Sequence, residues 1–107
     1  VTNININGLQ GFAKTTTVTV GTGLTQLPDY GQLNNRRSLI IYNNGSNTVF
    51  IGGSDVTSSN GLPVPASTYS PSVDAGYNMV IYGVTASSTS DVRVMEVSNN
   101  PTASKVQ

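Results

Sequence analysis

The sequence predicts an all-β fold, a compact jelly-roll-like β-sandwich of about eight short antiparallel strands. Three observations support this. No stretch carries apolar residues at the i, i+3, i+4 and i+7 spacing of a helix. Short alternating segments are separated by Gly, Pro and Asn. The 107 residues contain neither internal repeats nor a linker of distinct composition, so we expect one domain over residues 1–107.

Eight segments have the alternation or the β-branched content of strands. In chain order they are Thr2–Ile6, Thr15–Val20, Leu24–Leu27, Ser38–Tyr42, Thr48–Ile51, Val56 with its neighbours, Tyr77–Val84 and Asp91–Val97.

The first two segments are expected to be outer or edge strands, each with one face in solvent. In the first, Ile4 and Ile6 fall on one face, while Asn3 and Asn5 fall on the other. Residues 1–8 are therefore a possible N-terminal arm. The second segment alternates in the same way, with one face formed by Thr16, Val18 and Val20 and the other by Thr15, Thr17 and Thr19.

The next two strands are expected at the centre of the fold, because Leu39–Tyr42 and Val49–Ile51 are apolar on both faces. Asn44-Gly45 lies between them, and Asn-Gly is typical of a two-residue hairpin turn. A hairpin centred there places Ile40 opposite Val49 and Leu39 opposite Phe50.

A second hairpin is expected between Tyr77–Tyr82 and Val92–Val97, with a polar tip at Thr85–Ser90. A turn centred between residues 87 and 88 places Tyr82 opposite Arg93, where a weak cation–π contact is plausible. The intervening Gly52–Gly76 holds three of the five prolines. Because proline cannot donate to a strand ladder, this is an edge or crossover segment.

Composition excludes most enzyme chemistries. The chain has no Cys and no His, so it cannot form a catalytic triad with His, a Cys nucleophile or a Cys/His zinc site. Five Lys and Arg balance five Asp and Glu, which argues against nucleic acid as a ligand. We find no apolar run long enough to span a membrane and no secretory signal pattern. We expect no enzyme activity, no cofactor and no membrane association.

The acidic residues leave two alternatives open. Two carboxylates could in principle serve a glycosidase, but Asp55, Asp74 and Asp91 lie at turns and strand ends, where Asp ordinarily has structural roles. Asp55 lies among Ser and Asn oxygens that would suit calcium, although the pattern is not an EF-hand.

Surface contacts are the remaining candidates for function. Arg36 and Arg37 are the only local cluster of charge, and either form a strand-end pair that binds an acid or stays solvated, or contact a partner protein. Tyr30, Tyr69 and Tyr77 are similar candidates, and exposed tyrosines would suit a sugar ligand. The candidate partner contacts are Asn3, Ile4, Asn5, Ile6, Tyr30, Arg36 and Arg37.

One stretch resembles a known class of proteins. RSLIIYNNGSNTVFIGGSDVT at residues 37–57, NGLP at 60–63, Tyr77–Tyr82 and Asp91–Glu96 are similar to small virion proteins of tailed bacteriophages. The resemblance covers about 60 residues, by our count of these segments and the positions between them. It carries no catalytic or ligand residues, and residues 1–35 depart from its pattern.

The resemblance implies a non-enzymatic capsid decoration or cement protein. Such a protein would bind the major capsid protein across subunit junctions on the exterior of the virion, after synthesis in the host cytoplasm. Homo-oligomers, dimeric or trimeric, would match local capsid symmetry. The alternative is a tail- or fibre-associated module that binds host-surface carbohydrate.

Overall fold

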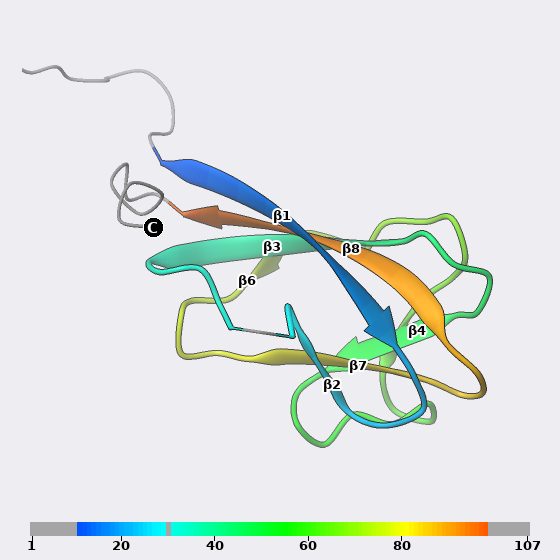
Figure 1. The fold of residues 1–107 in the computed structure, drawn as a ribbon. Coiled ribbons are helices and arrows are strands. Elements are labelled where there is room, and N and C mark those ends of the chain that lie inside the picture. The colour runs from blue at the N-terminus through cyan, green and yellow to red at the C-terminus, as the bar shows by residue number, and fades with distance from the viewer. Residues whose placement is uncertain (1–10, 30, 99–107) are drawn as a thin grey trace, which may run out of the picture.

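Two antiparallel sheets pack around one apolar core in the computed structural model, which describes residues 11–29 and 31–98 (Figure 1). The strands are β1 (Phe12–Val20), β2 (Thr25–Leu27), β3 (Arg36–Asn43), β4 (Val49–Gly52), β5 (Leu62–Val64), β6 (Val73–Asp74), β7 (Ile81–Thr85) and β8 (Ser90–Ser98). There is no helix in the described residues. The all-β prediction is therefore confirmed.

The first sheet has the strand order β1-β8-β3-β6, and the second has the order β2-β7-β4-β5. Most successive strands lie in opposite sheets, as the ribbon shows (Figure 1). This alternation is consistent with a jelly-roll-like sandwich, in which the chain crosses between layers at most turns.

Inward-facing aliphatic side chains from both sheets form the core. They include Val18, Ile41 and Val94 from the first sheet and Val49 and Ile81 from the second. Valine and isoleucine suit these positions because branching at Cβ fills the space beside a pleated strand. Burial of this cluster is the main source of stability expected for the fold.

β1 follows the predicted alternation. Thr16, Val18 and Val20 are buried, whereas Thr17 and Thr19 are exposed. β1 forms one edge of its sheet and pairs with β8 from Phe12↔Ser98 to Val20↔Ser90. The predicted strand at Thr2–Ile6 lies outside the described residues.

The predicted hairpin at Asn44-Gly45 is wrong. β3 and β4 lie inside different sheets, so Ile40 is opposite Met95 instead of Val49, and Phe50 is opposite Val84 and Pro63 instead of Leu39. The central placement of both strands is correct, because each has a neighbour on either side. The Asn-Gly pair makes a corner that carries the chain from one sheet to the other.

The second predicted hairpin is wrong for the same reason. β7 belongs to the second sheet and β8 to the first, and Tyr82 is opposite Gln26 and Gly52. Arg93 is opposite Tyr42 and Thr17 instead.

Three smaller corrections concern residues 52–80. Val56 is buried but lies in the loop between β4 and β5, where its side chain packs close to Gly52 and Gly61. Residues 77–80 form a turn and coil, so β7 begins only at Ile81. The proline-rich stretch contributes two short strands, β5 and β6. Both lie at sheet edges, as expected for a segment in which prolines lack the backbone N–H that a central strand donates.

Candidate binding face and buried ion pair

The two predicted arginines have opposite environments. The Arg36 side chain is fully buried, and its Nη1 lies 3.0 Å from Glu96 Oε2. Arg37, the next residue of β3, is exposed. The register of β3 against β8 shifts between Arg36 and Ser38, and this bulge places Arg36 on the same buried side as Leu39.

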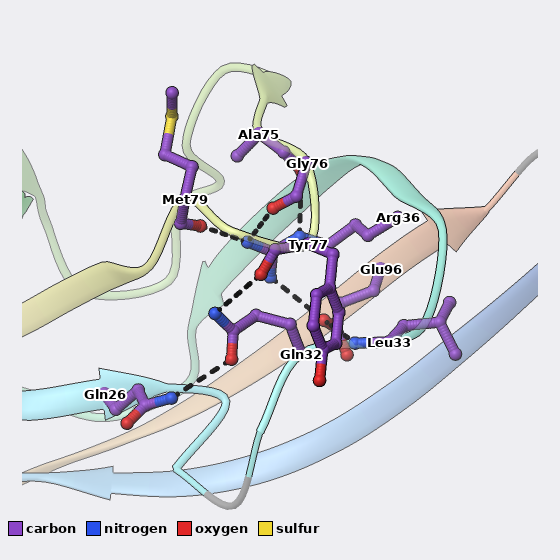
Figure 2. Close-up of polar contacts among 9 residues, drawn as sticks. All are labelled: Gln26, Gln32, Leu33, Arg36, Ala75, Gly76, Tyr77, Met79 and Glu96. Carbon is purple, nitrogen blue, oxygen red and sulfur yellow. Dashed lines mark hydrogen bonds and ion pairs between the residues drawn. The ribbon is translucent and has the colours of Figure 1, made fainter.

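Arg36 acts as a clamp between the first sheet and the β6–β7 connection (Figure 2). Its Nε donates to the Ala75 carbonyl at 2.9 Å, and Nη2 donates to the carbonyls of Gly76 and Met79. Glu96 Oε2 also accepts the Leu33 amide at 2.9 Å. The guanidinium is thus fully engaged inside the chain, which leaves it no surface for a partner.

Glu96 is 1% exposed, and its carboxylate forms the ion pair with Arg36. Its other oxygen, Oε1, has no hydrogen-bond partner among the described residues. The other acids of the sequence analysis are at the surface: Asp91 forms an ion pair with Arg93, and Asp55 and Asp74 are exposed. Glu96 was not foreseen as a buried partner of Arg36, since the two are 60 residues apart.

The Asp55 loop is held by its own hydrogen bonds. Asn60 Oδ1 accepts the Thr57 amide at 2.7 Å, and Asn60 Nδ2 donates to the Asp55 carbonyl. Among the described residues, no group of three or more His, Cys, Asp or Glu side chains is placed to hold a metal ion. The same residues include no helix long and apolar enough to cross a bilayer.

A groove of about 440 Å³ lies on the outer face of the first sheet, away from the core. It is lined by Thr15, Ile40, Tyr42, Tyr69, Arg93 and Met95. Five of these come from outward positions of β1, β8 and β3, which the register sets side by side as Thr15–Met95–Ile40 and Arg93–Tyr42. An outer sheet face is ordinarily polar, so this apolar set stands out.

Tyr69 is fixed above the groove by the chain that follows β5. Residues 67–70 run beside β3: the Ser67 amide donates to the Asn43 carbonyl at 2.8 Å, and the Ser70 amide donates to the Ile41 carbonyl at 2.7 Å. A single bridge then sets Tyr69 opposite Tyr42, with ring centroids 4.6 Å apart and an angle of 47° between the rings. Tyr69 remains 72% exposed.

Arg93 is the charged residue of the groove lining, and Asp91, which does not line the groove, balances its charge. Arg93 Nη2 lies 3.4 Å from Asp91 Oδ2, and both side chains are partly open to solvent. The Thr15 hydroxyl lies at the opposite edge, on β1. The groove therefore combines an apolar floor, two aromatic rings and polar groups whose charge Asp91 balances.

Among the sequence candidates that fall within residues 11–29 and 31–98, Tyr69 lines this groove. Tyr77 is half exposed elsewhere, on the β6–β7 connection (Figure 2). Asn3, Ile4, Asn5, Ile6 and Tyr30 lie outside the described residues. The groove was missed because apolar residues on both faces of a strand were interpreted as burial of both faces. In β3 the face that carries Ile40 and Tyr42 lines the groove instead.

Comparison with known proteins adds no relative. No family model matches the chain, and no curated protein matches it significantly.

Proposed function

We propose that this protein is a non-catalytic structural protein of a tailed-phage virion, of the capsid decoration type. It would bind the major capsid protein across subunit junctions on the outside of the head. The phage assignment comes from the resemblance over residues 37–97, and the structure contributes a surface suited to the task.

The observation that supports the attachment is the position of β1, which is the end strand of its sheet among the described strands. This strand has nine residues, and among the described strands it pairs only with β8. It contains one charged residue, Lys14, and no proline, so it lacks most of the features that protect edge strands from pairing. Such an edge can accept a strand from a neighbouring protein by main-chain hydrogen bonds.

Attachment of this kind stabilises an assembly without chemistry. A protein that binds only the assembled lattice stabilises it by mass action at each equivalent site. Main-chain contacts depend little on salt, unlike exposed ion pairs. The absence of Cys and His from the whole sequence and the use of Glu96 inside the fold both support a role without catalysis.

The test is occupancy on mature heads that lack the protein. Thr17→Lys with Thr19→Lys adds charge to the exposed face of β1, and Ser58→Lys with Ser59→Lys adds the same charge to the exposed β4–β5 loop as a control. We expect the β1 variant to lose occupancy by about 10-fold or more and the loop variant to keep it. Failure of the unmodified protein to bind, or equal occupancy of both variants, would reject the proposal.

Residues 1–8 belong to the same proposal, because they precede β1 in the chain. Deletion of this arm is expected to reduce occupancy on heads while the circular dichroism spectrum of the sandwich is kept. Unchanged occupancy would remove the arm from the attachment. Sedimentation of the free protein tests the proposed dimer or trimer.

The alternative location is a tail or fibre, with host carbohydrate as the ligand. The aromatic groove is the observation that favours it. Localisation of the protein in a reconstruction of the particle separates the two: copies over the shell support decoration, and copies at the tail support the alternative.

A further inference from the structure

We propose that the groove on the outer face of the first sheet binds a neutral saccharide, with Tyr69 and Tyr42 as the aromatic platform. This inference develops the carbohydrate-binding alternative of the proposed function and does not rest on capsid attachment, because the groove would have the same chemistry anywhere on a particle.

The first argument is the shape and lining of the groove. Its volume of about 440 Å³ falls within the range of small-molecule sites. Ile40 and Met95 form an apolar floor, and Met95 is 38% exposed although it lies on an inner strand. These side chains adjoin the two tyrosines, and a contiguous apolar patch bordered by polar groups is a feature of ligand-binding grooves.

The second argument is the aromatic pair. A sugar ring has a face of C–H groups and a rim of hydroxyls, so it packs its apolar face on an aromatic ring. Tyr69 offers such a ring, mostly exposed yet held in place by its contact with Tyr42 and by the backbone bonds of residues 67–70. A ring that is already fixed loses little conformational entropy when a ligand binds.

The third argument is the polar rim, which selects the class of ligand. Among the lining residues, the Arg93 guanidinium provides donors to hydroxyls, and the Thr15 hydroxyl can donate or accept. Because Asp91 balances the charge of Arg93, the rim has no excess positive charge for a phosphate or a carboxylate. A neutral sugar fits the floor, the rings and the polar lining together, because its apolar face packs on the rings and its hydroxyls pair with Arg93 and Thr15.

The experiment uses the isolated protein and a panel of neutral saccharides: glucose, galactose, mannose, N-acetylglucosamine and their short oligomers. Saturation-transfer NMR detects binding, and backbone amide shifts locate it. We expect at least one member of the panel to bind, with shifts at Ile40, Arg93 and Met95. Absence of binding by the whole panel at millimolar concentration would overturn the proposal.

Three variants assign the site. Tyr69→Ala is expected to weaken binding by about 10-fold or more, and Tyr69→Phe is expected to keep most of it because the ring remains. Tyr77→Ala removes another exposed tyrosine that does not line the groove, and it is the matched control. Binding that survives Tyr69→Ala, or that is lost equally in Tyr77→Ala, would overturn the assignment.

Two further results separate this proposal from capsid attachment. Tyr69→Ala is expected to leave occupancy on heads unchanged, since Tyr69 pairs with β3, and β8 separates β3 from β1 in the sheet. Sialylated sugars are expected to bind no better than their neutral counterparts. A clear preference for the anionic forms would reject a neutral-saccharide site.

Discussion

Two buried polar residues join the layers at opposite ends of the sandwich. Arg36 binds Glu96 and the β6–β7 connection at one end. At the other end Asn43, which is fully buried, uses all four of its side-chain hydrogen bonds: Nδ2 donates to the carbonyls of Asn47 and Val64, and Oδ1 accepts from the Gly45 amide and the Ser90 hydroxyl. Both residues restrict how the sheets can pack, since a shift would leave buried groups unpaired.

The first prediction concerns the buried ion pair. Glu96→Ala is expected to lower the free energy of unfolding by about 3–5 kcal/mol, because it leaves the Arg36 guanidinium buried without its counter-charge. Arg37→Met, at the exposed neighbouring position, is the control and is expected to change stability by less than about 0.5 kcal/mol. Urea unfolding followed by circular dichroism measures both.

The double variant Arg36→Met with Glu96→Leu, measured beside the single variants Arg36→Met and Glu96→Leu, completes the test. It is expected to lose less stability than the sum of the single changes, because an apolar pair leaves no uncompensated charge. Strict additivity of the two single effects would contradict the description of Arg36 and Glu96 as one coupled unit.

At the scale of elements, sequence predicted the strands better than their partners. The alternation of β1 and the apolar residues of β3 and β4 reflect which positions of each strand are buried, and the sequence of one strand is enough to predict this. Partner choice depends on whether the chain turns back in its own sheet or crosses to the other, and both routes use the same turn residues. The aromatic groove depends on that choice, because it unites β1, β8 and β3 with Tyr69.

Gly45 shows why the turn signal misled. Its φ is not in the positive range that the predicted turn needed, and the reason for glycine is lack of space: a Cβ there would overlap Ser90 Oγ and lie 2.8 Å from the Asp91 amide nitrogen. A sheet-crossing corner packs one strand end against another, so glycine is needed for close approach.

The corner gives the second prediction. Gly45→Ala is expected to lower the free energy of unfolding by about 1–3 kcal/mol, because the added methyl group must displace β8 or the corner. Gly23→Ala is the matched control: no atom lies within 4 Å of its Cβ position, so stability should stay the same or rise slightly. Equal effects of the two changes on the midpoint of thermal unfolding would contradict the crowding argument.

The whole molecule holds together with very little charge. Five basic and five acidic residues give a net charge of zero, and charged residues make up 9% of the chain. Of the ion pairs found within the described residues, Arg36–Glu96 is buried and Arg93–Asp91 is exposed. The rest of the stabilisation comes from the aliphatic core and from hydrogen bonds, neither of which is screened by simple salt.

The last prediction follows from the small contribution of exposed charge to stability. Between low and near-molar NaCl, the midpoint of thermal unfolding is expected to move by less than about 4 °C, which corresponds to at most about 1 kcal/mol for a domain of this size. The exposed pair can lose no more than that by screening, and the buried pair is screened much less. Arg93→Gln, which removes the exposed pair, should reduce the dependence further. A drop well beyond this limit, or one that persists in Arg93→Gln, would mean that surface charge contributes more to the stability of the sandwich than the Arg93–Asp91 pair accounts for.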